Sequence, residues 1–141
     1  KNKHGLVIGE HTAEKIKMEL GTALRVDDPE TMDVRGRDVA TGMPKQITVN
    51  ENEIEEALHD TLEQIVSAAV NVLETIPPEL ASDIIDRGIM LTGGTSLLKG
   101  VDQLFSARLK VPVVVSQDPL DNVAKGAGEM LERMQKTERK K

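Results

Sequence analysis

Residues 88–98, with the sequence GIMLTGGTSLL, constrain the fold of this chain more than any other segment. Three apolar residues are followed by the glycine pair Gly93-Gly94 and then by Thr95 and Ser96, residue types that commonly begin helices. Glycine permits positive φ angles and leaves no Cβ in the path of a ligand. The segment therefore predicts a strand, a glycine turn and a helix that bring backbone against a bound nucleotide.

A simpler interpretation of the same loop stays open. A tight strand–helix turn capped by Ser or Thr needs no ligand, and short glycine motifs are weak signals. The position at the carboxyl end of a strand favours a ligand, because open α/β sheets bind their ligands there. The chain contains neither a Walker A loop nor a dinucleotide fingerprint.

The residues after this turn continue to alternate between helix and strand. Helices are predicted over residues 97–109 and 120–134, and a short apolar strand over residues 112–116. The strand–helix–strand order implies a right-handed crossover and two parallel strands. Both strands are continuous apolar runs, as is typical of strands covered on both faces. In the last helix, Ala124 and residues 126–128 form a small-residue surface that favours close packing against another element.

The first half of the chain changes its periodicity twice. A helix is predicted over residues 11–20, ended by Gly21. Alternating apolar residues on either side of residues 41–44 then predict a β-hairpin or meander of two to three strands. A long helix follows, capped by Asn50 or Asn52 and ended by Pro77-Pro78, with a continuous apolar stripe. Its acids, which include Glu53, Glu55, Glu56 and Glu63, are interpreted as a solvated face.

Composition excludes several classes of function. The chain has 141 residues, a formal net charge of -6, one Phe and no Tyr or Trp, which argues against nucleic-acid binding. Without cysteine there are no disulfides or thiolate metal sites. His4, His11 and His59 lack metal-ligand spacing, and no Ser/His/Asp arrangement suggests catalytic residues. No apolar run approaches the ~20 residues of a membrane span. The chain lacks an initiator Met and is interpreted as a segment of a longer protein.

The second candidate site is the first helix. Glu14 and Lys17 lie one helical turn apart and could bind a ribose hydroxyl and the edge of an adenine ring. Taken alone, the pair is more simply a solvated ion pair, because such pairs are common on helix surfaces.

Four segments, in this order, carry a resemblance to a known family. They read IGEHTAEKIKMELG, RGRDVATGMPKQITVNENEIEEAL, PPELASDIIDRGIMLTGGTSLLKGVD and PVVVSQDPLDNVAKGAGEML. Together they resemble the C-terminal half of the MreB/Mbl family, bacterial actins that determine rod shape. The resemblance covers essentially the whole chain.

The resemblance implies an α/β fold, the second lobe of the actin/heat-shock chaperone ATPase (ribonuclease H-like) fold. Residues 1–60 would form a small β-rich subdomain with flanking helices. Residues 61–141 would form a large α/β subdomain that carries the adenosine motif, its last helix reaching toward a missing first lobe.

The resemblance also implies a set of nucleotide-binding residues. They are Glu14, Lys15, Ile16, Lys17, Gly93, Gly94, Thr95, Ser96 and Leu97. No catalytic or metal-binding residue is implied, because the family's phosphate motifs would lie upstream of Lys1. The chain alone is therefore expected to be inactive as an ATPase.

The implied parent would bind ATP with Mg²⁺ and polymerise head to tail in the cytoplasm, at the inner face of the membrane. It would determine cell shape by organising cell-wall synthesis, with the elongation machinery as partner and membrane contact only through the absent N-terminal half. Two alternatives stay open, namely a lobe of a sugar-kinase or chaperone-type ATPase and a non-catalytic interaction module.

Overall fold

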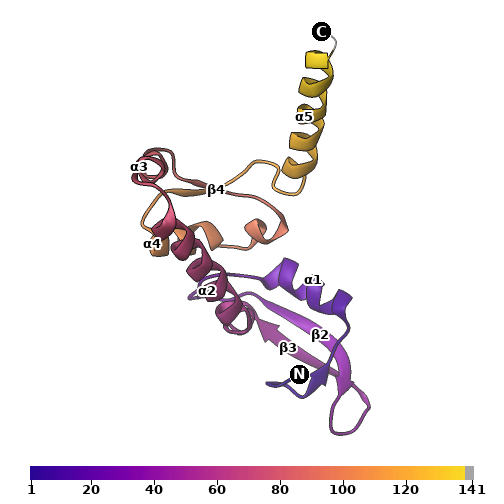
Figure 1. Ribbon diagram of the computed structural model, residues 1–141. Helices are drawn as coiled ribbons and strands as arrows, with labels where there is room; N and C mark the ends of the chain where they lie inside the picture. The colour runs from indigo at the N-terminus through magenta and orange to yellow at the C-terminus, as the bar shows by residue number, and fades with distance from the viewer. Residues whose placement is uncertain (139–141) are drawn as a thin grey trace.

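A computed structural model describes residues 1–138 of the chain. An N-terminal region (residues 1–50) holds an antiparallel sheet, and a C-terminal region (residues 78–138) holds a parallel one. One long helix, α2 (Glu51–Thr75), runs from the first region to the second (Figure 1).

The N-terminal region confirms the β-hairpin alternative of the prediction and adds a third strand from before the first helix. Strands β1 (Leu6–Val7), β2 (Thr31–Asp38) and β3 (Pro44–Asn50) form one antiparallel sheet in that order. Helix α1 (Glu10–Leu20) connects β1 to the loop before β2 and packs on the sheet with Ile16 and Leu20 buried. The core of this region is entirely aliphatic: Leu6, Ile16, Leu20, Val34 and Val49.

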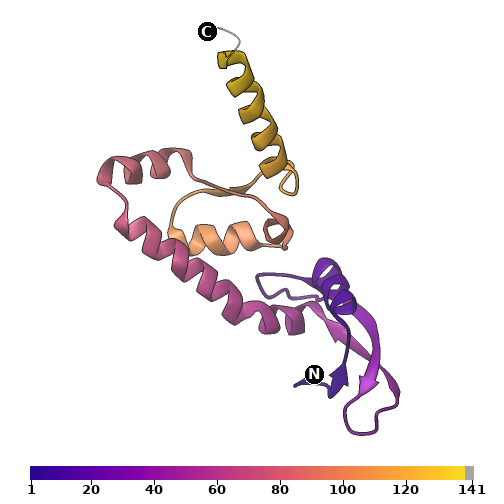
Figure 2. The same ribbon diagram turned by 45° about the vertical axis from the view of Figure 1, so that its right-hand side comes forward.

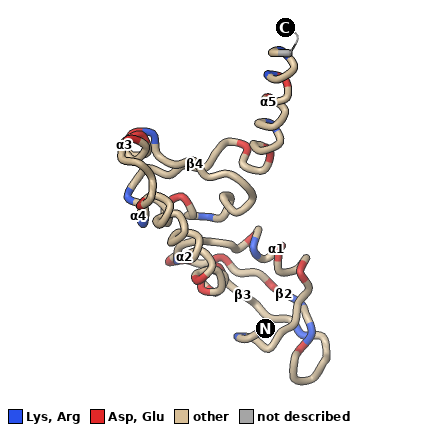
Figure 3. Tube along the Cα trace, in the orientation of Figure 1, with Lys and Arg blue, Asp and Glu red and all other residues tan. Residues whose placement is uncertain are grey.

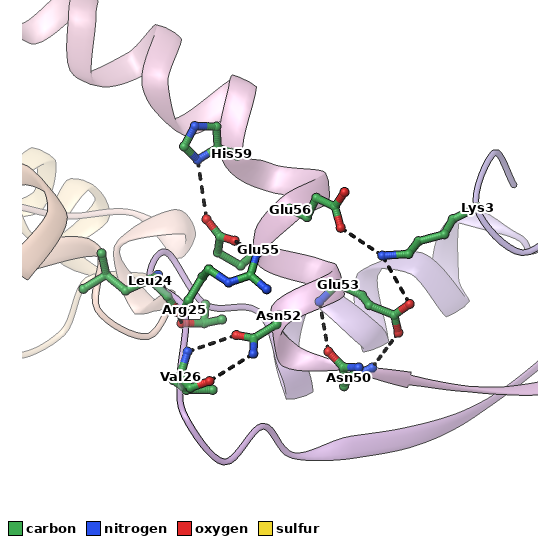
Figure 4. Close-up of polar contacts among 11 residues, drawn as sticks. Lys3, Leu24, Arg25, Val26, Asn50, Asn52, Glu53, Glu55, Glu56 and His59 are labelled. Carbon is green, nitrogen blue, oxygen red and sulfur yellow. Dashed lines mark hydrogen bonds and ion pairs between the residues drawn. The ribbon is translucent and has the colours of Figure 1, made fainter.

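Helix α2 begins with a reciprocal capping box at Asn50, one of the two asparagines predicted to cap it. The Asn50 side chain accepts a hydrogen bond from the Glu53 amide at 3.1 Å, and the Glu53 carboxylate accepts one from the Asn50 amide at 3.1 Å (Figure 4). Along the helix, Ile54 packs on the N-terminal core, whereas Leu62 and Val66 are buried in the second core. The division predicted after residue 60 falls inside α2, which serves both cores.

The C-terminal region follows α2 without a long loop. It contains α3 (Pro78–Arg87), β4 (Ile89–Leu91), the 3₁₀ turn η1 (Gly94–Leu97), α4 (Val101–Leu109), β5 (Val113–Val115) and α5 (Asn122–Glu138). As predicted, β4 and β5 are parallel neighbours, paired from Ile89 with Val113 to Leu91 with Val115. The second core gathers Ala23, Leu62, Val66, Val101, Phe105 and Val113.

The helix predicted over residues 97–109 is wrong at its beginning. After β4 the chain forms only the single 3₁₀ turn η1, and α4 begins at Val101. Gly100 has a left-handed backbone conformation, φ 72°, which no continuous α-helix accommodates. The last helix differs from its prediction as well, since it spans Asn122–Glu138 instead of residues 120–134.

One face of the parallel sheet is uncovered, which contradicts the prediction of burial on both faces. Met90 of β4 and Val114 of β5 are partners in the register and remain 68% and 52% exposed. Helix α5 stands apart from the rest of the fold in both views (Figures 1 and 2). A Cβ placed on Gly126 or Gly128 would meet no atom within 4 Å, so the small-residue surface of α5 packs against nothing in residues 1–138. None of the described helices combines the length and apolarity that crossing a bilayer requires.

Replacing the cap residue tests how much α2 contributes to stability. We expect Asn50→Ala to lower the free energy of unfolding by about 1 kcal/mol, because the side-chain acceptor for the Glu53 backbone amide is lost while the bond from the residue-50 backbone amide to the Glu53 carboxylate remains. Chemical denaturation followed by circular dichroism measures the difference. Asn71→Ala, at an exposed position inside the same helix, is the matched control and should be neutral or slightly stabilising. An equal loss in both variants would contradict the capping role.

Candidate nucleotide-binding site

The glycine turn after β4 requires glycine at its first position. Gly93 has φ 86° and ψ 167°, a combination that side chains other than hydrogen rarely allow. Ser96 closes the turn, since its hydroxyl donates to the Gly93 carbonyl at 2.7 Å and its amide donates to the same oxygen at 3.1 Å. Ser96 is buried, so its hydroxyl shapes the loop.

The loop after β5 anchors this turn from the other strand. The Gly93 amide and the Thr92 hydroxyl both donate to the Pro119 carbonyl, at 2.8 and 3.1 Å. The Asn122 side-chain amide donates to the Ser116 hydroxyl at 2.6 Å and to the Thr92 hydroxyl at 3.2 Å. The carboxyl ends of both parallel strands are thereby tied together. Sequence reasoning missed Asn122, because an asparagine at the start of a predicted helix is more simply interpreted as a cap.

The outer surface of the turn is open. Gly94, Thr95 and Leu97 are exposed, and the Thr95 hydroxyl has no hydrogen-bond partner among the described residues. A helix dipole contributes little here, because η1 has only four residues and does not continue into an α-helix. The turn offers a ligand bare backbone, one hydroxyl and the apolar side chain of Leu97.

Of the α1 residues predicted to contact a nucleotide, all except Ile16 lie on the exposed side of the helix. Lys17 Nζ is 2.7 Å from Glu14 Oε2, and both side chains are about half exposed. Lys15 pairs more loosely with Glu19, at 3.7 Å. Ile16 is buried in the N-terminal core, so its side chain fixes the helix instead of facing solvent. Contact between these residues and a ligand stays a prediction.

The structure brings α1 and the glycine turn next to each other, as both ribbon views show (Figures 1 and 2). The loops that follow them form an isolated parallel bridge between Thr22 and Lys99. Its hydrogen bond runs from the Ala23 amide to the Lys99 carbonyl, at 2.8 Å. The two predicted segments therefore belong to one side of the molecule although about 80 residues separate them.

A separate cavity lies elsewhere against α1. It measures about 1050 Å³ and opens between α1, the antiparallel sheet and the start of α2. Glu14 and Lys17 line it, together with apolar residues of the sheet such as Leu6 and Val34. No residue of the glycine turn contributes to its wall, so this cavity and the turn are separate features.

A charged cluster beside the turn was not predicted. Lys99 Nζ lies 2.6 Å from Glu51 Oε1 and 3.3 Å from Glu30 Oε2, and the Glu30 amide donates to Glu51 Oε2 at 3.0 Å. The hydrogen bond from Lys99, followed by that from the Glu30 amide, holds the pKa of the Glu51 carboxyl below its usual value. The same contact raises the pKa of Lys99. Lys99 lies two residues after the turn, and its nearest neighbours in the sequence are apolar residues and a glycine. An isolated lysine in such a context is the signal that could have identified it.

The interpretation of the α2 acids as a solvated face is wrong for Glu55. Glu55 is buried, with Arg25 Nη1 at 3.9 Å and His59 Nδ1 at 3.4 Å from its carboxylate (Figure 4). It lies one turn after Glu51 on the side of α2 that meets the loop before β2.

The described residues offer little support for a nucleic acid or a metal ion as the ligand. Acidic and basic residues are interspersed along the trace (Figure 3). Within residues 1–138, no group of three or more His, Asp or Glu side chains is arranged to hold a metal ion.

Comparison with known proteins decides the family. The sequence profile of the MreB/Mbl protein family matches residues 1–139. The chain belongs to the MreB/Mbl family. It is 50% identical to the cell shape-determining protein Mbl of Bacillus subtilis (strain 168), over all of this chain and 42% of that protein. It is also 50% identical to MreB of Escherichia coli (strain K12), over 94% of this chain and 38% of that protein.

The fold agrees with that of a solved member of the MreB/Mbl family. MreB5 of Spiroplasma citri, crystallised with AMPPNP, superposes with a TM-score of 0.92 at 29% identity, over 99% of this chain and 42% of that one. This agreement confirms the predicted α/β actin-type lobe. The chain spans about two fifths of the length of the relatives it matches.

Two glycine variants separate conformation from open space at the turn. We expect Gly93→Ala to cost about 1–3 kcal/mol of unfolding free energy, because alanine strains at φ 86°. Gly94→Ala is the matched control and should change stability by less than about 0.5 kcal/mol, since the nearest atom to a new Cβ is Leu120 Cδ2 at 3.5 Å. Denaturant unfolding of both variants makes the comparison, and similar losses would refute the assigned conformation.

The Glu51 carboxylate predicts an acid-sensitive contribution to stability. Because its pKa is lowered in the folded state from the usual 4.5, the contribution is present above pH 4.5 and is lost as the pH falls through the folded-state value. We expect Glu51→Gln to lower the unfolding free energy at pH 7 by about 1.5–3 kcal/mol, and by much less at pH 3. Thermal unfolding at both pH values tests this. Glu74→Gln, at an exposed position on the same helix, should show no such difference.

Proposed function

We propose that this chain is the C-terminal half of an ATP-binding, filament-forming bacterial actin that determines rod cell shape. The observation that carries the proposal is the open glycine turn, with Gly93 at φ 86° and Gly94 bare, at the carboxyl ends of two parallel strands. Support comes from relatives that are named as shape-determining proteins and from a relative crystallised with AMPPNP.

The proposed contribution of this chain is the adenosine side of the nucleotide site. Gly94 and Thr95 would let the nucleoside lie against backbone, Leu97 would offer an apolar contact, and Gly93 and Ser96 would hold the turn in shape. Glu14, Lys15 and Lys17 would contribute from α1 through their exposed polar groups, with Ile16 anchoring that helix.

The proposal assigns the phosphates and Mg²⁺ to the remainder of the protein. The described residues bring no carboxylate cluster together that suits Mg²⁺, and a short 3₁₀ turn is a weak anion site. We therefore assign no catalytic step to this chain.

The uncovered surfaces fit a partner lobe of the same protein. The exposed apolar side chains of α5 recur at helical spacing: Val123, Met130, Leu131 and Met134. The small residues of α5 are exposed as well within residues 1–138, and Met90 and Val114 add an open sheet face. We infer that the first lobe packs on α5 and that filaments grow head to tail. The parent would lie in the cytoplasm, at the inner face of the membrane, and serve the cell-wall elongation machinery.

A single added carboxylate tests the site in the full-length protein. We expect Gly94→Asp to weaken ATP binding by roughly tenfold or more, because a negative side chain would occupy the surface that the nucleotide approaches. ATP-dependent sedimentation should be lost with it. Fluorescent ATP titration and sedimentation measure the two effects.

Gly9→Asp supplies the matched control for this experiment. Gly9 precedes α1 in extended geometry with nothing within 4 Å of a new Cβ, so aspartate there caps the helix and should leave ATP binding unchanged. Unchanged ATP affinity in Gly94→Asp would remove the turn from the site. A wild-type protein that neither binds ATP nor sediments with it would refute the proposed function.

A further inference from the structure

The segment that leaves the glycine turn is held by the segment that leaves α1. Lys99 follows η1 after one residue, and its carbonyl accepts hydrogen bonds from the Ala23 amide at 2.8 Å and the Thr22 hydroxyl at 3.4 Å. The approach is close, since a Cβ on Gly21 would lie 2.6 Å from Leu98 Cδ1. The residues that follow α1 and the residues that follow the glycine turn are therefore in direct contact.

The Lys99 side chain adds contacts with the start of α2 and with the residue before β2. Its ammonium group lies 2.6 Å from the buried carboxylate of Glu51, the first residue of α2, and 3.3 Å from Glu30, which precedes β2. Among the described ion pairs, those of Lys99 alone join a residue after position 88 to residues before position 60. Lys99 thus contacts two separate segments of the N-terminal region and the first residue of α2.

The loop between α1 and β2 is itself fixed to α2. The Asn52 side chain forms two hydrogen bonds with the Val26 backbone, accepting from its amide at 2.9 Å and donating to its carbonyl at 3.0 Å (Figure 4). The Glu30 amide donates to the second oxygen of Glu51 at 3.0 Å. A displacement of Lys99 would therefore move a loop that is connected at both ends, to α1 and to β2.

The glycine turn has a different set of anchors. Gly93 and Thr92 are bound to Pro119, in the loop that follows β5. A ligand that contacts the turn can thus displace the residues at its end, before Lys99. The residues at its start, Thr92 and Gly93, stay hydrogen-bonded to Pro119 beside the parallel sheet.

We propose that Lys99 is a positioning residue that couples nucleotide occupancy at the glycine turn to the loop of residues 21–30 and the antiparallel sheet. The inference rests on the proposed nucleotide function. Through Glu51 and Glu30, Lys99 sets the spacing between α1 and the turn, so the two halves of the site are presented together. Loss of the ammonium group uncouples them without removing a ligand contact.

Hydrogen–deuterium exchange of the full-length protein, with and without saturating ATP and Mg²⁺, tests this coupling. In the wild type, ATP should protect amides of residues 92–98 and also those of residues 21–38. In Lys99→Met, which keeps the aliphatic stem, protection of residues 92–98 should persist at saturation while that of residues 21–38 is lost. ATP affinity should fall by roughly tenfold, a typical coupling factor between two sites.

Three further variants separate positioning from a general loss of structure. Lys99→Arg should restore the remote protection, because a guanidinium can still reach both carboxylates. Glu51→Gln should reproduce the Lys99→Met pattern from the other partner, and the double variant should be no worse than either single one. Lys45→Met is the control, since Lys45 pairs with Asp38 within the N-terminal region at 3.1 Å and should behave as wild type.

The outcomes distinguish the coupling from the function on which it rests. Remote protection that survives unchanged in Lys99→Met and Glu51→Gln overturns the coupling but leaves nucleotide binding intact. Uniformly faster exchange in Lys99→Met without ATP, not rescued by Lys99→Arg, overturns it in favour of a purely structural role. Absence of ATP protection in the wild type overturns the proposed function and the coupling with it.

Discussion

One helix contributes apolar side chains to both hydrophobic cores of this chain. Helix α2 places Ile54 against the aliphatic core of the antiparallel sheet, and Leu62 and Val66 in the core beneath the parallel strands. Neither sheet covers its own apolar face, because the first has three strands and the second only two. Helix α2 consequently joins the two regions through the packing of its side chains.

The sequence predicted well wherever a long periodic pattern or a strong breaker was present. The apolar stripe of α2, its asparagine cap and Pro77 located that helix, and alternation located β2 and β3. The parallel pairing of β4 and β5 followed from the strand–helix–strand order alone. These features are local or are governed by general rules of handedness.

Predictions failed where a single backbone conformation or a distant partner decided the outcome. Residues 94–98 have the composition of a helix start, but the left-handed Gly100 leaves room for only one 3₁₀ turn. Glu55 was assigned to solvent because its burial depends on the loop before β2, which no pattern in α2 can reveal. Asn122 and Lys99 act on segments 30 and 77 residues away, and so their roles at the candidate site emerge only from the fold.

The length of α2 has a mechanical consequence. Its 25 residues make a rod of about 37 Å at 1.5 Å per residue. A tilt of about 5° about Val66, which lies about 22 Å along the helix from the capped end, would therefore carry that end through about 2 Å, more than the rise of one helical residue. Changes in side-chain packing near Phe105, too small to alter the local fold, would be amplified along α2 into displacements of the whole antiparallel sheet.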